Sequence, residues 1–227
     1  AYYINVRKLP VYSMGSMIAI KDDQNPFFTS NTSLTFNWGG TTDKVNTAII
    51  TLKSRSHNEK VVDRLQYYLN YRKEGKYQQV DAYKATPFMV IVDTTKAQMV
   101  NKQIKVTMKD SMSFYLEADF PGGNILTQHY NESMRGEKKI FFMEAQSFKK
   151  EFKFGEQISL PFFAGTFFPN PDVFSVNTTP YYISFTNFDS TVKAYKNVVI
   201  RPEGKGSSVL RLALTGLNKA KLVDYLN

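Results

Sequence analysis

The sequence predicts an α+β fold, in which both ends of the chain form a mixed sheet with helices on one side. Three observations lead to this class. Apolar residues recur at helical spacing in residues 41–65, short strand-like runs crowd residues 87–180, and helix and strand patterns mix again in residues 181–227. We therefore expect one α/β base domain from residues 1–86 and 181–227, and an inserted all-β sandwich or barrel from residues 87–180.

Residues 11–21 alternate loosely between apolar and polar and predict a first strand. The helical stretch follows, with apolar residues at i, i+3, i+4 and i+7 and a polar block at residues 53–58. Ser56 and Glu59 have the spacing of a capping box, so a second helix can start there. We expect either one kinked helix or two in tandem. The side chains expected to pack on the sheet are Val45, Ile49, Leu52, Val62 and Leu65.

From residue 87 onward, short runs rich in aromatic and β-branched residues are separated by turn residues. The predicted strands are residues 88–93, 103–108, 113–118, 139–144, 157–162 and 181–186. After them, Asp189 is placed to cap a short helix through Tyr195, and residues 204–206 read as a hairpin turn. Leucines at alternate positions in residues 210–214 predict a strand with one apolar face. Asn218 is expected to cap a last helix over residues 219–227.

Composition narrows the class of protein. The chain has 227 residues, of which 42% are hydrophobic and 22% charged, which favours a globular fold over disorder. It has no cysteine, so disulfides, thiolate zinc sites and cysteine nucleophiles are excluded. The net charge of +9 suggests an anionic partner, although basic side chains spread over a solvated surface would explain it equally well. The start at Ala1 and the stop inside a helical pattern at Asn227 indicate a portion of a longer protein.

A search for catalytic or metal-binding patterns finds none. Neither His57 nor His129 has a second ligand at helical spacing, so we expect no metal and no cofactor. Glu117 and Asp119 alternate onto one face of a predicted strand, where a glycoside hydrolase would need a pair, but solvated surface charge explains them as well. We expect no catalytic residue in this chain.

Aromatic residues cluster where the inserted block is expected to end. Flat rings stack on sugars or nucleobases, or they fill a core. Neither Lys nor Arg occurs between Phe154 and Lys193, which argues against nucleic acid. The possible glycan contacts are Phe162, Phe163, Phe167, Phe168, Tyr181 and Tyr182.

The segment LKSRSHNEKVVDRL at residues 52–65 resembles a conserved segment of the Wzz-like chain-length determinants. These polysaccharide co-polymerases include the periplasmic parts of bacterial tyrosine autokinases. Residues 2–23, residues 83–88 and SVLRLALTGLNKAKLVDYLN at residues 208–227 resemble further segments of the Bacteroidetes-type members, in the same order. His57 and Asn58 stand where the family commonly has apolar residues, so we expect this corner to be more exposed here.

The resemblance implies the membrane-proximal periplasmic domain of a bacterial inner-membrane protein. Such a domain forms a homo-oligomer and regulates the chain length and export of capsular polysaccharide, exopolysaccharide or lipopolysaccharide O-antigen. Its implied partners are the nascent polysaccharide, a polysaccharide polymerase and an outer-membrane exporter. Flanking transmembrane helices, absent from this sequence, would hold it at the membrane. The alternative is a carbohydrate-binding module that uses the aromatic cluster.

Under this resemblance the chain itself is not an enzyme, and whether the parent protein carries a cytoplasmic tyrosine kinase domain stays open. Lys53 and Arg55 lie on a polar face between the two apolar groups, where they are possible subunit contacts. A local ion pair to Asp43, Glu59 or Asp63 is the other role open to them.

Overall fold

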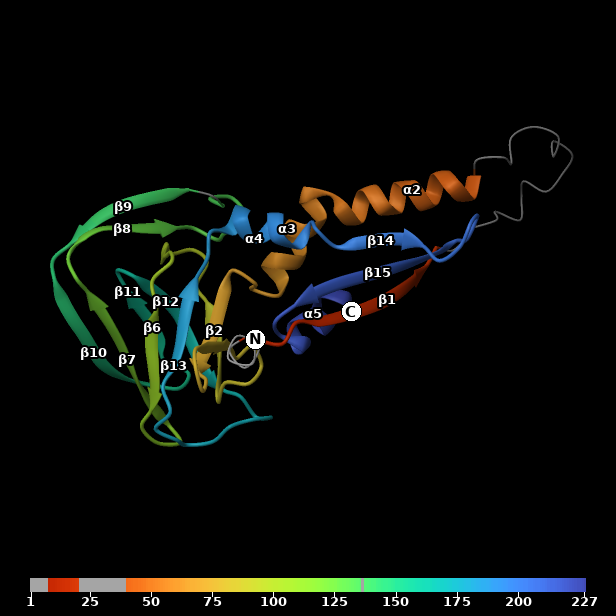
Figure 1. Cartoon of the computed structure of the whole chain (residues 1–227). Coiled ribbons are helices and arrows are strands. Elements are labelled where there is room, and N and C mark those ends of the chain that lie inside the picture. Colours follow the sequence, from red (N-terminus) through yellow and green to blue (C-terminus); the bar gives the residue numbers. More distant parts are fainter. Residues whose placement is uncertain (1–7, 21–39, 136) are drawn as a thin grey trace, which may run out of the picture. The chain divides into compact units, whose positions relative to one another are not determined.

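The computed structural model describes residues 8–20, 40–135 and 137–227, and of residues 40–42 the backbone alone. The chain forms two compact units (Figure 1). Unit 1 comprises residues 8–10 and Val62–Thr191, and unit 2 comprises the described residues of Val11–Val61 and Val192–Asn227. Unit 2 is therefore assembled from segments that lie before and after unit 1 in the sequence.

The sheet of unit 2 has three antiparallel strands, in the order β1 (Tyr12–Ala19), β15 (Val209–Gly216) and β14 (Val199–Pro202). Leu210, Leu212 and Leu214 are buried, and they alternate along β15 with residues that are exposed or half-buried. This pattern of alternation confirms the predicted strand with one apolar face. A turn between β14 and β15 confirms the predicted hairpin, because the N–H of Glu203 donates to the carbonyl of Val209 at 2.9 Å.

Two helices complete the core of unit 2, α2 (Gly40–Lys53) and α5 (Lys219–Leu226). Val45 of α2 and Leu222 of α5 are buried in one cluster with the leucines of β15. Asn218 caps α5, since its side-chain oxygen accepts a hydrogen bond from the N–H of Lys221 at 3.2 Å. The predictions of a C-terminal helix and of its cap are confirmed.

The predicted mixed α/β layer is wrong. Both pairings in the sheet of unit 2 are antiparallel, and the described residues form fifteen strands but four helices, so the chain is mainly β. The reason lies in the connections. β1 pairs directly with β15 from the far end of the chain, and a tight hairpin joins β14 to β15. Parallel neighbours would have needed a longer crossover connection, usually a helix, which neither pairing contains.

Unit 1 contains three antiparallel sheets. The largest has the order β10 (Gln146–Lys153), β7 (Ser113–Phe120), β6 (Ile104–Met108), β13 (Tyr181–Phe185), β2 (Leu69–Glu74) and β3 (Gln79–Asp81). The second has the order β11 (Gln157–Leu160), β12 (Phe163–Pro169) and β4 (Phe88–Val92), and the third β5 (Gln98–Met99), β8 (Gly123–Gln128) and β9 (Lys138–Met143). Each strand predicted between residues 88 and 186 overlaps one of these strands.

Aromatic rings fill the space between the six-stranded sheet and the sheet that contains β12. The rings of Phe114 on β7 and Phe167 on β12 have centroids 4.6 Å apart. Those of Phe88 on β4 and Tyr181 on β13 are 5.8 Å apart and nearly perpendicular. All four residues are buried, so the two sheets pack face to face around an aromatic core.

The division between the units falls inside two helices, α3 (Arg55–Arg64) and α4 (Phe188–Tyr195). It lies at residues 61–62 and 191–192, whereas the sequence analysis placed domain boundaries at residues 86–87 and 180–181. The cap of α4 also differs from the prediction. Asn187 accepts a hydrogen bond from the N–H of Ser190 at 3.1 Å, so Asn187 caps the helix and Asp189 already belongs to its first turn.

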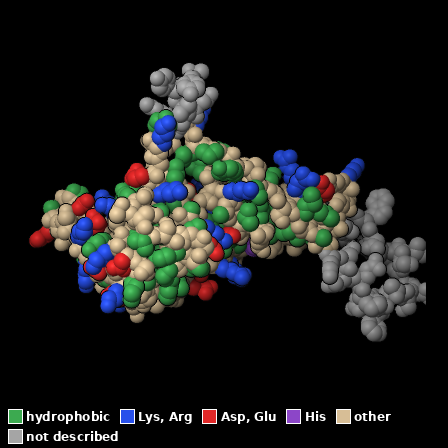
Figure 2. Space-filling view, turned by 90° about the horizontal axis from the view of Figure 1, so that it is seen from below, with side chains coloured by type: hydrophobic (Ala, Val, Ile, Leu, Met, Phe, Trp, Pro, Cys, Tyr) green, Lys and Arg blue, Asp and Glu red, His purple; other side chains and the backbone are tan. Residues whose placement is uncertain are grey.

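The surface carries its charge in mixed form. Figure 2 shows Lys and Arg side chains spread among Asp and Glu over the visible face, without a continuous basic patch. Within the described part of the chain, no helix is both long enough and apolar enough to cross a membrane.

Candidate functional site

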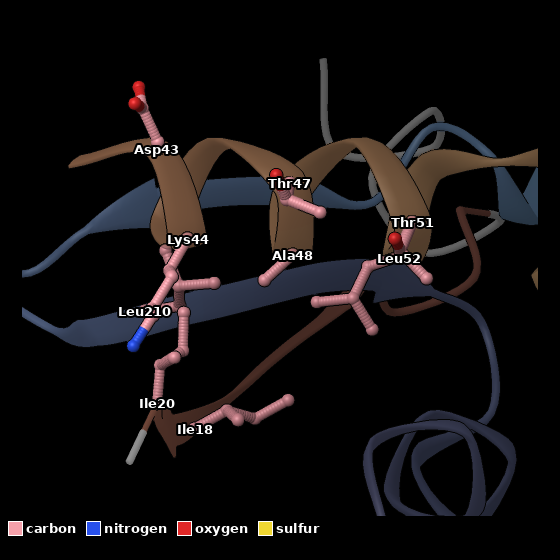
Figure 3. A pocket seen from close by; sticks show the side chains of 9 residues that line it. All are labelled: Ile18, Ile20, Asp43, Lys44, Thr47, Ala48, Thr51, Leu52 and Leu210. Atoms are coloured by element: carbon pink, nitrogen blue, oxygen red, sulfur yellow. The ribbon is translucent and has the colours of Figure 1, made fainter. Parts of the chain in front are cut away.

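An apolar groove runs along unit 2 between helix α2 and the β1 side of the sheet. Its volume is about 510 Å³. Figure 3 shows Lys44, Ala48 and Leu52 pointing from α2 toward the strands, while Asp43 points away. The lower wall is formed by Ile18 and Ile20 from β1 and the residue after it, and by Leu210 of β15. A groove of this width and apolarity is suited to receive side chains of a protein partner.

β1 borders the groove and is the outer strand of its sheet, with β15 as its partner among the described strands. Its residues alternate between the two faces of the sheet, so Ile18 faces the groove and Met17 faces the other way. Met17 is 59% exposed and Ile18 38% exposed, which is high for large apolar side chains on a strand. An edge strand with exposed apolar residues is a preferred place for protein association.

Helix α2 ends at Lys53 and α3 begins at Arg55, so the prediction of two helices in tandem is confirmed. Ser54 lies between them. Its side-chain oxygen accepts a hydrogen bond from the N–H of His57 at 3.1 Å, which is the bond of an N-cap residue. The predicted cap at Ser56 is therefore wrong. The helix starts two residues earlier because Ser54 already satisfies its first free N–H groups.

Asn58 fixes this junction from inside. Its side-chain nitrogen donates to the carbonyl oxygens of Leu52, at 3.0 Å, and Ser54, at 2.9 Å. Its side-chain oxygen accepts from the hydroxyl of Tyr225 on α5, at 2.9 Å. Asn58 is 0% exposed, so the expectation of a more exposed corner is wrong at this residue. A polar side chain is tolerated here because each of its polar atoms is hydrogen-bonded.

Tyr225 is held in place as firmly as its partner. Its ring stacks on that of Tyr195, with centroids 5.2 Å apart and planes 20° apart, and its hydroxyl also lies 3.3 Å from the carbonyl of Tyr195. Burial raises the pKa of Tyr225 to about 12, so the hydroxyl stays protonated and remains a donor.

The two predicted subunit contacts lie at the same junction. Lys53 is exposed at the end of α2. Arg55 is also exposed, and its Nε donates to Glu59 at 2.6 Å across one turn of α3. Of the two roles predicted for Arg55, the local ion pair to Glu59 is present. An exposed pair of this kind contributes little to stability, and it leaves the remaining guanidinium N–H groups available to a partner.

Four of the six aromatic residues predicted to contact a glycan lie in the core of unit 1, namely Phe162, Phe163, Phe167 and Tyr181. The ring centroids of Phe163 and Phe167, for example, are 5.6 Å apart inside that core. These four rings cannot stack on a sugar because other side chains cover them. Phe168, which is 37% exposed, and the half-buried Tyr182 are the two that solvent reaches.

The acidic pair on β7 does not have the geometry of a hydrolase. Glu117 is held between Lys105, at 3.2 Å, and Lys149, at 3.3 Å. Burial favours the neutral form of Glu117, but hydrogen bonds from both lysines outweigh this effect and lower its pKa. Asp119 accepts a hydrogen bond from Ser147 at 2.7 Å. Both carboxylates thus have structural partners on the face of the sheet.

The histidines lie apart. His57 is in α3, and His129 is buried in unit 1 just after β8. Across the described ranges, no group of three His, Cys, Asp or Glu side chains could hold a metal ion. A scan against protein-family models and a search of curated proteins found no match to the chain.

Sequence reasoning missed most residues of this site. The groove residues Ile18, Thr47, Thr51 and Leu210 alternate or repeat as core residues do, so no local pattern marks them as a surface. The one available signal was Asn58, a polar residue where the resembled family has apolar ones. It predicted exposure, but the structure uses it as a buried link to Tyr225.

Proposed function

We propose that the chain is the periplasmic scaffold of an inner-membrane polysaccharide co-polymerase, which associates with copies of itself and regulates polysaccharide chain length. One observation carries the proposal. Residues 52–65 and 208–227 bear the resemblance to this class, and they meet in one unit through Asn58 and Tyr225. Segments so far apart in sequence are expected to share a unit if they belong to one functional domain.

The surface that we assign to self-association is the groove beside α2 together with β1. A second copy is the occupant because the class implied by the resemblance works as a homo-oligomer. The groove offers apolar contact area through Ile18, Ala48 and Leu52, and Lys53 and Arg55 follow at the end of α2 as exposed charged residues. An apolar centre with charged residues near its rim is the usual anatomy of a protein interface.

A matched pair of substitutions on β1 tests this surface. Ile18→Glu places a charge in the groove, whereas Met17→Glu places one on the opposite face of the same strand. We expect Ile18→Glu to weaken self-association at least about tenfold in sedimentation velocity, and Met17→Glu to leave it nearly unchanged. Circular dichroism would verify that both variants stay folded. A wild-type chain that stays monomeric at high concentration, or equal effects of both variants, would contradict the assignment.

The biological role is tested in the organism that carries the parent gene. Deleting the gene should change the length distribution of capsule, exopolysaccharide or lipopolysaccharide on a gel. Complementation with the Ile18→Glu gene should restore the normal distribution less well than complementation with Met17→Glu. An unchanged distribution after deletion would rule out the proposed role.

A further inference from the structure

A second pocket lies wholly within unit 1, beside the outer strand β4. Its volume is about 250 Å³, and its walls combine aromatic rings with charged and amide side chains. This size is near the lower limit of ligand pockets and too small for a nucleotide or a drug-sized molecule. The lining residues that matter for its chemistry are Gln66, Tyr71, Tyr83, Lys84, Asn170 and Asp172.

The pocket exists because side chains occupy the free edge of β4. The N–H of Val90 donates to the hydroxyl of Tyr71 at 3.2 Å, and the N–H of Val92 donates to the side-chain oxygen of Gln66 at 3.1 Å. These bonds replace the neighbouring strand that would otherwise pair with the edge. The space beside β4 is thus closed to a peptide strand and left open to a small molecule. The hydroxyl of Tyr71 accepts in this bond, so its own hydrogen can be donated elsewhere.

The opposite wall is rigid. Asn170 is buried, its side-chain nitrogen donates to the carbonyl of Thr86 at 3.0 Å, and its N–H donates to the carbonyl of Pro87 at 3.0 Å. Its side-chain oxygen in turn accepts the N–H of Asp172 at 3.3 Å, which fixes the backbone at that carboxylate. A wall held by three hydrogen bonds presents Asp172 to the pocket without a large loss of conformational freedom on binding.

Two residues on the rim have unusual backbones. Gln66 has φ of 48° and Lys84 has φ of 58°, and among the described non-glycine residues the one other with positive φ is Asn101. Side chains other than glycine adopt this left-handed region at a cost, and such residues concentrate at functional sites. At Gln66 the conformation accompanies the bond to Val92, and at Lys84 it places a charged residue at the mouth.

The chemistry of the walls identifies the ligand class. The rings of Tyr71 and Tyr83 have centroids 6.5 Å apart and planes at 63°, and Lys84 Nζ lies 6.0 Å from the centre of the Tyr83 ring. An apolar aromatic wall flanked by donors and a carboxylate suits a ring with C–H groups on its faces and hydroxyls around its edge. We propose that this pocket binds one pyranose residue of a polysaccharide, an inference that rests on the proposed function for the identity of the natural glycan.

Nuclear magnetic resonance titration of the ¹⁵N-labelled chain tests the pocket directly. The probes are methyl β-glucopyranoside, N-acetylglucosamine, glucuronic acid and, as a small ligand that is not a sugar, leucine. We expect at least one sugar to shift the amide signals around Lys84, Met89 and Asp172 with a Kd in the millimolar range. Failure of every sugar to shift these signals at 50-fold higher affinity than leucine is not required; any saturable shift by a sugar without one by leucine supports the site, and the reverse overturns it.

Two substitutions and a control localise the binding. Asp172→Asn removes the carboxylate, and Lys84→Gly removes the ammonium while keeping a residue that accepts positive φ. Each should weaken sugar binding at least about tenfold, and Lys96→Ala, an exposed residue outside the pocket, should leave it unchanged. Equal binding by the wild type and both pocket variants would overturn the proposal.

The outcome can be separated from that of the proposed function. If the pocket binds no sugar while gene deletion still alters polysaccharide length, the pocket assignment fails and the scaffold role stands. If sugars bind and deletion changes nothing, the scaffold role fails and the pocket remains a sugar site with another purpose.

Discussion

The hydroxyl of Tyr225 donates a hydrogen bond to the side-chain oxygen of Asn58, 2.9 Å away, and so joins two residues 167 positions apart in the sequence. The same Asn58 side chain holds the carbonyl groups at the break between α2 and α3. One buried amide therefore links the helix junction to the C-terminal helix. This link is the contact from which the stability of unit 2 is best tested.

Replacing Tyr225 by Phe removes the hydroxyl and keeps the ring on Tyr195. The buried oxygen of Asn58 then loses its partner, and we expect the free energy of unfolding to fall by about 1–3 kcal/mol. Urea denaturation followed by circular dichroism measures the change. Tyr12→Phe, which alters a 39% exposed residue of β1, is the control and should change stability by less than about 0.5 kcal/mol. Equal effects would show that the bond to Asn58 does not matter.

Replacing Asn58 by Ala should destabilise the chain more than Tyr225→Phe does. The substitution removes the acceptor for Tyr225 and also both donors to the carbonyls of Leu52 and Ser54. We expect a loss of about 2–4 kcal/mol, measured in the same denaturation experiment. In the double variant, the two losses should add up to less than their sum because they share one bond. Full additivity would contradict the direct contact.

Gly165 on β12 is a position where even one methyl group should be harmful. A β-carbon there would lie 2.7 Å from the carbonyl oxygen of Ile91 and 3.2 Å from the ring of Phe163. We expect Gly165→Ala to lower the thermal midpoint and to cost about 1–3 kcal/mol, since β12 and β4 would have to separate. Gly204→Ala, where nothing lies within 4 Å, is the control and should be almost neutral. The outcome against us is a stable Gly165→Ala protein.

His57 should make stability depend on pH. Partial burial lowers its pKa below the usual 6.5, and the charge of Lys60 lowers it further. The unfolded chain therefore binds a proton more readily than the folded one, so stability should fall as the pH drops through 6.5 toward the lower folded pKa. His57→Gln should show a smaller fall between pH 7.5 and 5. Identical pH profiles in urea denaturation would exclude this role for His57.

The sequence predicted the elements whose signals are local. Residues 41–65 carry a helical repeat, and Asn218 precedes an apolar helix face, so α2, α3 and α5 were expected near their observed places. The alternating leucines of β15 were recognisable for the same reason. Each of these signals depends on neighbours within one or two turns or strands, which is the range that periodicity covers.

The fold class and the site could not be predicted in this way. Whether β1 pairs with β15 in an antiparallel sheet depends on contacts between the two ends of the chain, which no local period encodes. Burial of Phe163 and Phe167 depends on the sheet that faces them. Asn58 looked exposed because its partner, Tyr225, comes from another helix. The resemblance to co-polymerases supplied the idea of function, and the structure supplied the surfaces to test it.

The discontinuous make-up of unit 2 has a consequence for biosynthesis. The residues of unit 1 from Val62 to Thr191 leave the ribosome as one run and can collapse early, but β1 must wait until β15 has been translated. Until then, the apolar sides of β1 and α2 have no leucines to cover them. The newly made amino-terminal segment is thus the part of the nascent polypeptide that chaperones are expected to shield.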